Sequence, residues 1–243
     1  MSGTQDLPVP SRALAIGAHA DDVEFGCGAT LAKWAAAGSE VHLCVLTDGS
    51  KGSWDPGADL GELAATRREE QEAAADALGI KAVHFLDFVD GELQDGLCER
   101  GELSAALRDV RPEVVLGHDP WKRYRLHPDH RAAGYLTIDA IVAARDPHFF
   151  PDRGQPHRPA TLLLFEPEVI DHHEDIAGHL ETKIAALLEH KTQWHSTMGI
   201  DPASDQADTQ RKSFESRIKE EARTAGKEAG IEFAEAFKRI QEL

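Results

Sequence analysis

Four side chains able to bind a metal or move a proton stand close together in the segment AHADDVE: His19, Asp21, Asp22 and Glu24. His19 and Asp22 are three residues apart, so a turn leaving a strand can aim both side chains at one point. Imidazole and carboxylate are good ligands for a borderline divalent metal. Asp21 would point elsewhere and could accept a proton from water. The alternative is a loop whose carboxylates cap the next helix.

A second cluster, His127, Asp129 and His130, lies in the segment HPDHR. One histidine could bind the metal while the other faces a substrate carbonyl. Asp129 could orient the ring of His127 by accepting its second N–H. The alternative is that Asp129 caps a helix beside two solvated histidines. Two such clusters favour a shared metal site if the fold brings them together.

The elements around these clusters predict where they lie. Strands are predicted at residues 12–17, 41–47, 82–86, 113–117 and 161–165, and helices at residues 25–37, 60–78, 101–110, 129–144 and 176–190. This alternation predicts an α/β fold with a parallel sheet and helices on both faces. Ligands bind at the carboxyl ends of the strands in such sheets. Each cluster follows a predicted strand, so we expect both at this edge.

The C-terminal part of the chain changes in character. Residues 201–208 are polar, and residues 211–243 are charged and predicted to be helical. Phe233, Phe237 and Ile240 would share one face of the last helix, which we expect to pack on the domain. The alternative is a contact between copies in a homo-oligomer. The sequence thus predicts one domain at residues 1–200 and a C-terminal helical extension at 201–243.

Composition narrows the classes of partner. The formal net charge is −17, with 43 acidic and 26 basic residues, so nucleic acid and membrane surfaces are not expected partners. The three cysteines, Cys27, Cys44 and Cys98, match no zinc-finger or redox spacing and fit a reduced compartment. We see neither a signal peptide nor a run long enough to cross a bilayer, and we expect a cytoplasmic protein.

The sequence resembles the LmbE-like, or PIG-L-like, N-deacetylases. The likeness runs from about Ala13 to Gln193 and rests on AHADDVE, FGCGATLAKWAAAG, VLTDGSKGS, TRREEQEAAADALG, LDFVDGEL and HPDHR in that order. The resemblance implies a Rossmann-like fold and one divalent metal, zinc or alternatively Fe²⁺. It also implies a hydrolase that removes acetyl groups from N-acetylglucosamine-type sugars or their conjugates.

Matched by position, the resemblance assigns roles to individual residues. The metal ligands would be His19, Asp22 and His130, and Asp21 would be the general base. His127, supported by Asp129, would stabilise the oxyanion or act as an acid, and the sequence does not decide which residue protonates the leaving amine. Arg67 and Asp90 fall where the family binds sugar hydroxyls. The alternatives are a surface helix charge for Arg67 and a turn residue for Asp90.

Two segments depart from the family pattern or are specific to this chain. Ala20 stands where the family usually has proline, so we expect a slightly looser loop with unchanged chemistry. The segment KRYRL before HPDHR is expected to shape specificity. Nine other histidines are expected to have surface or packing roles: His42, His84, His148, His157, His172, His173, His179, His190 and His195.

Other functions compete with the deacetylase hypothesis. The rival from another class is a metal-containing sugar-binding or regulatory module without turnover, which would more often have lost Asp21 or His127. A non-haem iron oxygenase also uses two histidines and a carboxylate, but more usually on a β-barrel. A phosphatase would need a basic phosphate clamp, and Gly26 and Gly28 do not complete the GxGxxG pattern of a nucleotide-binding module.

Overall fold

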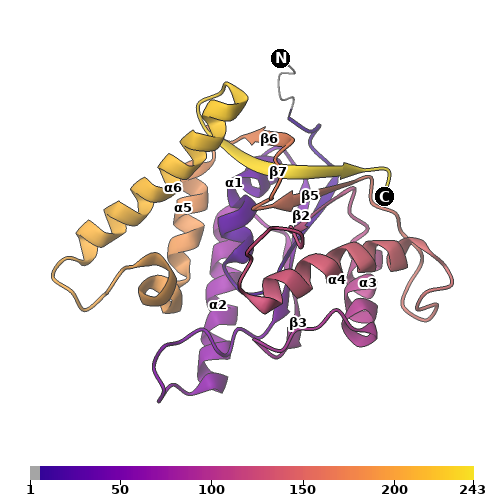
Figure 1. Cartoon of the computed structure of the whole chain (residues 1–243), viewed down its shortest axis with the longest axis horizontal. Helices are drawn as coiled ribbons and strands as arrows, with labels where there is room; N and C mark the ends of the chain where they lie inside the picture. The colour runs from indigo at the N-terminus through magenta and orange to yellow at the C-terminus, as the bar shows by residue number, and fades with distance from the viewer. Residues whose placement is uncertain (1–5) are drawn as a thin grey trace.

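A single seven-stranded sheet organises the computed structural model, which describes residues 6–243 (Figure 1). The strand order is β3-β2-β1-β4-β5-β7-β6, and the strands from β3 to β5 are parallel to one another. The α/β fold predicted from the sequence is confirmed. The strands are β1 (Arg12–Gly17), β2 (Glu40–Thr47), β3 (Ala82–Phe88), β4 (Val114–His118), β5 (Thr161–Phe165), β6 (His172–Asp175) and β7 (Ala234–Gln241).

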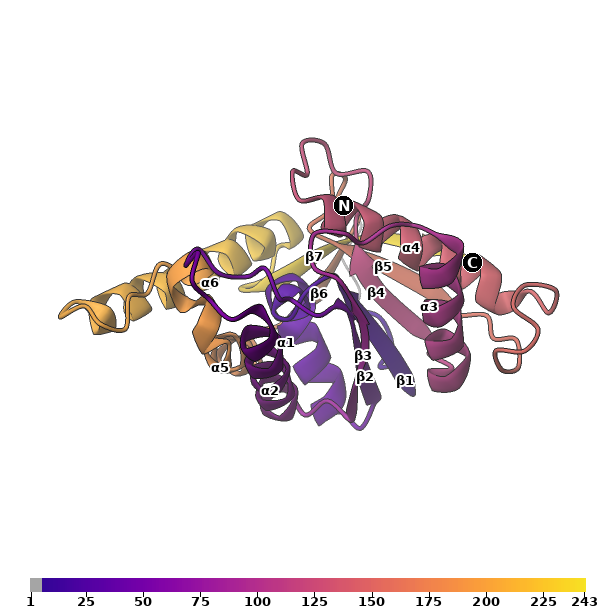
Figure 2. The same cartoon turned by 90° about the horizontal axis from the view of Figure 1, so that it is seen from below.

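Helices cover both faces of the sheet (Figure 2). The helices are α1 (Asp22–Ala36), α2 (Leu60–Leu78), α3 (Leu97–Val110), α4 (Pro128–Arg145), α5 (Leu180–Glu189) and α6 (Ala207–Ala229), with a 3₁₀ turn, η1 (Lys191–Gln193), and a π turn, η2 (Trp194–Met198). One apolar core lies between the sheet and α1, α2 and α5, and a second lies between the sheet, α3 and α4. Within residues 6–243, no helix has the length and apolar character needed to span a bilayer.

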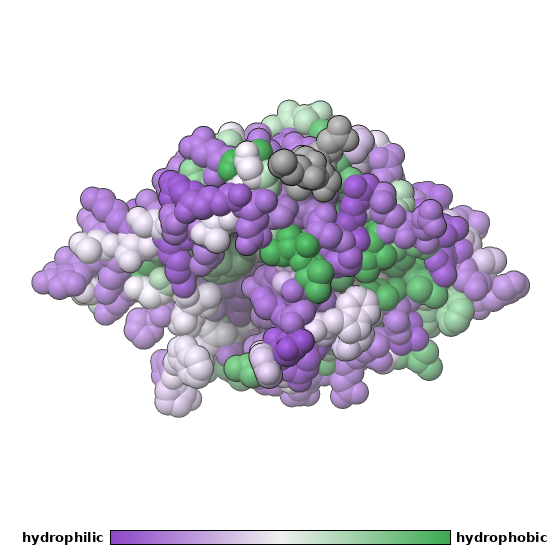
Figure 3. All heavy atoms as spheres, turned by 45° about the horizontal axis from the view of Figure 1, so that its top comes forward, coloured by the Kyte–Doolittle hydropathy of each residue, from purple (hydrophilic) through white to green (hydrophobic). Residues whose placement is uncertain are grey.

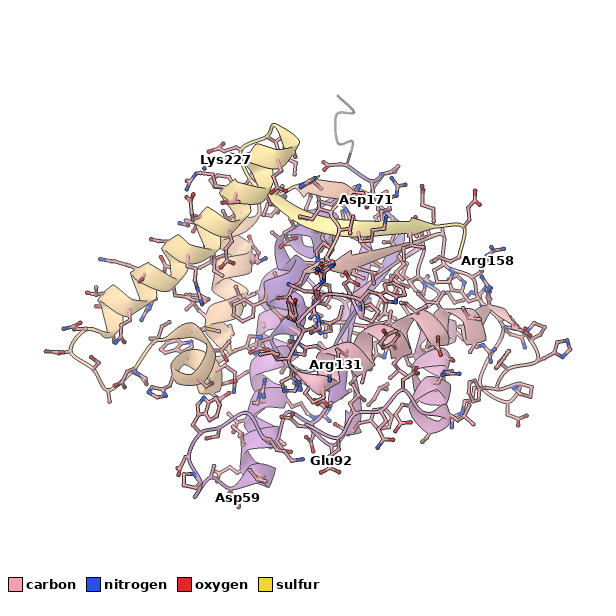
Figure 4. The ribbon with its side chains drawn as sticks, viewed as in Figure 1. Asp59, Glu92, Arg131, Arg158, Asp171 and Lys227 are labelled. Atoms are coloured by element: carbon pink, nitrogen blue, oxygen red, sulfur yellow. The ribbon has the colours of Figure 1, made fainter. Side chains whose placement is uncertain are left out.

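Helix α2 shows how local sequence sets these boundaries. Its observed bounds match the predicted residues 60–78. Asp59 precedes the helix at the bottom of Figure 4, and its Oδ1 accepts N–H groups of Gly61 and Glu62 at 2.9 and 3.0 Å. Gly79 ends the helix at φ 76°, a left-handed conformation that glycine adopts without strain. Signals at both ends therefore explain why this helix could be predicted.

Helix α1 is interrupted at Cys27, whose φ and ψ of −153° and 16° are not helical. The Lys183 ammonium donates to the Phe25 carbonyl before the break at 2.7 Å. The Glu235 carboxylate accepts two backbone N–H groups after the break and pairs with Lys183 at 2.7 Å. We call Lys183 and Glu235 the α1 clamp. It satisfies backbone groups that the break would otherwise leave unpaired inside the core.

The end of the chain is a strand, which corrects the prediction of a helix there. Residues 207–229 form the expected helix α6, but β7 enters the sheet antiparallel between β5 and β6. Phe233, Phe237 and Ile240 each pack against a different apolar cluster, so they do not form the single face that the predicted helix would have had. Strand β6 was also missed, since residues 172–175 fell among loop residues. The division of the chain at residue 200 stays a prediction.

Candidate metal centre and active site

Both predicted clusters lie at the point where the strand order reverses. Strand β1 lies between β2 and β4, so the chain leaves β1 and β4 toward helices on opposite faces of the sheet. AHADDVE follows β1 and HPDHR follows β4, and this is where ligands bind in open parallel sheets. The two clusters come together here as the sequence predicts.

The three predicted metal ligands are neighbours. His130 Nε2 lies 3.1 Å from Asp22 Oδ1, and His19 Nδ1 lies 3.4 Å from Asp22 Oδ2. Two ligand atoms held by a tetrahedral zinc at about 2.1 Å are about 3.4 Å apart. Burial opposes ionisation of Asp22, but His130 and His118 hold its pKa well below the usual range. The donor types therefore fit one divalent metal, and the spacing of His130 Nε2 from Asp22 Oδ1 lies close to that expected for two of its ligands.

His118 is a neighbour of this centre that the sequence analysis did not identify. Three overlapping groups have potential ligand atoms within 4.8 Å of one another: His19, His127 and His130; Asp22, His118 and His130; and His19, Asp90 and Asp129. The predicted set of ligands spans these groups rather than forming one of them. Burial lowers the pKa of His118, and its Nε2 lies 3.1 Å from Asp22 Oδ2. The predicted fourth strand ended at residue 117. Extending it by one residue would have placed His118 at the carboxyl end of the strand, where ligands are expected.

Asp129 contacts a different histidine from the one expected. Its Oδ2 lies 3.1 Å from His19 Nε2 and accepts the N–H of Gly91 at 2.7 Å. Its Oδ1 accepts the N–H of Leu93 at 3.3 Å. These contacts turn Asp129 toward His19, and no hydrogen bond joins Asp129 to His127 in the described part of the chain, so the support of His127 by Asp129 stays a prediction. With its Nε2 oriented by a carboxylate, His19 could offer Nδ1 to a metal.

Asp90 also faces His19, with Oδ1 3.2 Å from His19 Nε2. Its Oδ2 accepts the backbone N–H of Lys51 at 3.0 Å, and the side chain lines the pocket. Asp90 is buried, so it is more than a surface turn residue. Its carboxylate links the loop after β2 to the histidine at the end of β1.

Asp21 lies beside the predicted ligands without being one of their close neighbours. Its φ of 95° is rare for a residue with a side chain, and its N–H donates to Gln71 Oε1 at 3.2 Å. The residue is 7% exposed, and its side chain lines the pocket. Burial raises the pKa of Asp21 to about 6, although the nearby Arg67 acts in the opposite direction. The strained turn thus directs Asp22 and Asp21 to different positions in one site.

Arg67 is buried beneath this turn rather than exposed on the surface of α2. Its Nη2 donates to the Ala20 carbonyl at 2.7 Å, and its Nη1 donates to the Gly49 carbonyl at 3.0 Å. Nη2 also lies 3.9 Å from Asp21 Oδ1. A side chain at Gly52 would place its Cβ 2.2 Å from Nη1, so glycine makes room for the guanidinium. Arg67 restrains the turn in which the family usually has proline.

His127 occupies the N-cap position of α4 without a capping hydrogen bond from its side chain, and it is exposed at the pocket. Its ring centroid lies 4.7 Å from that of His19 and 4.8 Å from that of His130. Partial burial and the neighbouring His19 and His130 lower the pKa of His127. A neutral imidazole at this position keeps one N–H that can donate to a bound carbonyl oxygen.

A pocket of about 820 Å³ opens above these groups. The predicted metal ligands line it, and α6 contributes Arg217, Ile218 and Glu221 to the lining. Four histidines line it: His19, His118, His127 and His130. None of the nine histidines expected to have other roles does so among residues 6–243. The face in Figure 3 is mainly hydrophilic, which agrees with the charge of −17.

Comparisons with known proteins identify the family of this chain. A family model described as PIG-L, GlcNAc-PI de-N-acetylase, matches residues 14–141, more than half of the chain. A diacetylchitobiose deacetylase of Thermococcus kodakarensis is 36% identical over 189 residues, which cover 75% of this chain and 70% of the relative. A 1D-myo-inositol 2-acetamido-2-deoxy-α-D-glucopyranoside deacetylase of Actinosynnema mirum is 31% identical over 237 residues, covering 77% and 82%.

The same likeness extends to three dimensions. The N,N'-diacetylchitobiose deacetylase of Pyrococcus horikoshii, solved with its inhibitor MPG, superimposes with a TM-score of 0.84 at 29% identity. The match covers 96% of this chain and 84% of that one, so it includes the C-terminal region beyond the family model. With its paired HADD and HPDH motifs meeting at one site, the chain belongs to the PIG-L family of de-N-acetylases.

Proposed function

We propose that the protein is a divalent-metal-dependent hydrolase that removes the acetyl group from an N-acetylated amino sugar carrying a further group. The observation that carries this proposal is the convergence of His19, Asp22 and His130 with Asp21 on the floor of one pocket. A degenerate binding module would not need a carboxylate placed beside the ligands. Zinc is the preferred metal in the proposal because two imidazoles and one carboxylate are a common catalytic zinc set.

Each residue of the site has a separate proposed role in the hydrolysis. A bound divalent metal supplies a Lewis acid that makes water more acidic and polarises the acetamide carbonyl. Asp21 accepts a proton from the water whose oxygen attacks the carbonyl carbon. His127 donates an N–H to the carbonyl oxygen as negative charge develops on it. The C–N bond then breaks, and the proton held by Asp21 is available to the leaving nitrogen, giving acetate and a free amine.

The shape of the pocket favours a substrate larger than one sugar ring. Its volume of about 820 Å³ lies toward the upper end of the usual range of ligand pockets, about 300–1,000 Å³. The relatives named above act on a disaccharide and on a sugar–inositol conjugate, and we extend this class of substrate to the present chain. Arg67 and Asp90 line the pocket and are proposed to contact sugar hydroxyls, in addition to their protein partners.

Metal analysis and an amine-release assay test the proposal together. The purified protein should bind about one divalent metal, and His19→Ala, Asp22→Ala and His130→Ala should each lose most of it. The zinc-loaded enzyme should release amine and acetate from N,N'-diacetylchitobiose or an N-acetylglucosaminyl inositol faster than from simple acetamides. Activity on phosphate esters with none on N-acetyl compounds would refute the proposed reaction. Full metal content in all three variants would refute the ligand set.

A further inference from the structure

We propose that Arg125 and His118 form a positioning pair that holds Asp22 as a single-oxygen ligand of the metal. This inference rests on the proposed metal-dependent function and concerns residues outside the predicted catalytic set. Arg125 lies in the loop between β4 and α4, within the segment KRYRL that was expected to shape specificity. The structure buries Arg125, whereas Tyr124 beside it is 86% exposed.

The contacts of His118 determine which ring nitrogen carries hydrogen. Arg125 Nη1 lies 3.1 Å from His118 Nδ1. A guanidinium has only donors, so Nδ1 must offer its lone pair, and the hydrogen of the neutral ring is then on Nε2. His118 Nε2 therefore donates to Asp22 Oδ2, 3.1 Å away. The 3.4 Å approach of the Ala18 N–H to Nε2 is longer and incompatible with this assignment.

This hydrogen prevents His118 from being a metal ligand itself, because a metal needs the lone pair on Nε2. The hydrogen bond from His118 also occupies Oδ2 of Asp22. Oδ2 accepts His118 Nε2–H and the backbone N–H of His19 at 2.8 Å, while Oδ1 faces His130 Nε2 at 3.1 Å. Oδ1 is then the oxygen left for the metal. A carboxylate bound through one oxygen leaves a coordination position open, as catalytic zinc sites require.

Surrounding groups keep this pair in place. The ring of His118 stacks on that of His130, with centroids 4.5 Å apart, and meets the ring of Phe165 edge-on at 4.6 Å. The same Nη1 of Arg125 also donates to Glu166 Oε2 at 2.8 Å, and Nη2 donates to the Glu166 carbonyl at 3.2 Å, so two nitrogens restrain the guanidinium. Arg131, labelled near the start of α4 in Figure 4, donates to backbone carbonyls of the loop that carries Arg125. The loop is therefore tied both to α4 and to the end of β5.

Zinc competition and cobalt spectroscopy test the inference in full-length protein stripped of metal. His118→Phe keeps a ring of similar size but removes the donor, and should weaken zinc binding by about 10- to 100-fold, the usual cost of losing an outer-layer partner. The visible spectrum of the Co²⁺ form should change as Asp22 binds through both oxygens. His118→Gln should recover part of the affinity, since its amide N–H can donate to Oδ2. His84→Phe, the same change on β3 outside the pocket, is the control and should change neither readout.

A double-mutant cycle tests whether Arg125 acts through His118. Arg125→Met should weaken zinc binding, and combining it with His118→Phe should add little further loss. Arg125→Met also carries the test if His118→Phe does not fold. Wild-type zinc affinity and an unchanged Co²⁺ spectrum in both single variants would overturn the inference. Equal losses in His118→Gln and His118→Phe would show that the loss does not depend on a donor to Asp22 Oδ2, and would overturn the inference as well. Failure of the wild type to bind metal would instead refute the proposed function.

Discussion

The α1 clamp predicts a large stability effect from a residue near the C-terminus. Glu235 is 5% exposed, accepts the N–H groups of Ala29 and Thr30, and pairs with Lys183. Glu235→Ala would leave the buried Lys183 ammonium without its partner and two helix N–H groups without an acceptor. Breaking a buried pair from one side costs about 3–5 kcal/mol. We expect the free energy of unfolding to fall by that amount.

A second pair in the chain provides a matched control. Lys219 and Glu181 also lie 2.7 Å apart, but Glu181 is 76% exposed. Water already solvates both charges there, so Glu181→Ala should cost about 1 kcal/mol or less. Urea unfolding, with equal m-values in wild type and variants, would measure both losses. The comparison separates burial from the distance between the charges, because the distance is the same in the two pairs.

Removing both members of the clamp tests the mechanism of the loss. Lys183→Met combined with Glu235→Ala should destabilise the protein by less than the sum of the two single changes, because no uncompensated charge remains. The single change Glu235→Ala should also weaken zinc binding, since the first turn of α1 carries Asp22. A loss below about 1 kcal/mol for Glu235→Ala, equal to that of the surface control, would refute the assigned role of the clamp.

Three further outcomes concern the site itself. Asp21→Asn should keep the metal and the fold while lowering kcat by about 10²- to 10⁴-fold; loss of the metal here but not in Asp22→Asn would mean that the two roles are exchanged. His127→Ala should lower kcat more than it raises KM, because its hydrogen bond would matter mostly in the transition state, and an unchanged kcat would exclude this role. Removing metal with a chelator should lower the midpoint of thermal unfolding, and restoring zinc should raise it. At a zinc concentration of 100 times the dissociation constant, binding to the native state should add about 2.7 kcal/mol to the free energy of unfolding. An unchanged midpoint at saturating zinc would contradict a zinc site in the native state.

Much of the fold could be predicted because local signals were strong. The buried run RALAIG and the helix from Leu60 to Leu78, with Asp59 before it and Gly79 after it, needed no tertiary information. The convergence of the two motifs followed from the rule that parallel strands present their carboxyl ends at one edge. The same reasoning reached His19 and Asp22, whereas the choice of His130 rather than His127 as the third ligand came from the family resemblance.

Other features depend on contacts that no local pattern shows. Strand β7 has the sequence AEAFKRIQ, in which charged residues interrupt the alternation, and its bulky residues also fit a helical spacing. Its strand character comes from pairing with β5 and β6, which are distant in sequence. The direction of Asp129 was likewise missed, because the side chain turns toward His19 across the sheet edge rather than toward its neighbour along the chain. Side-chain direction at a loop–helix junction follows from packing that sequence spacing does not encode.

The residues proposed to carry out the reaction and those expected to influence substrate choice lie in different parts of the chain. Every proposed metal ligand and proton-transfer group lies between residues 19 and 130, inside the segment that the family model matches. The pocket is also lined by Arg217, Ile218 and Glu221 on α6, outside that segment. Helix α6 leads directly into β7, whose Glu235 clamps the helix that carries Asp22. The C-terminal region therefore lines part of the pocket and also holds the helix that carries Asp22, so we expect a change in α6 to alter the preferred substrate while the groups proposed to carry out hydrolysis stay in place.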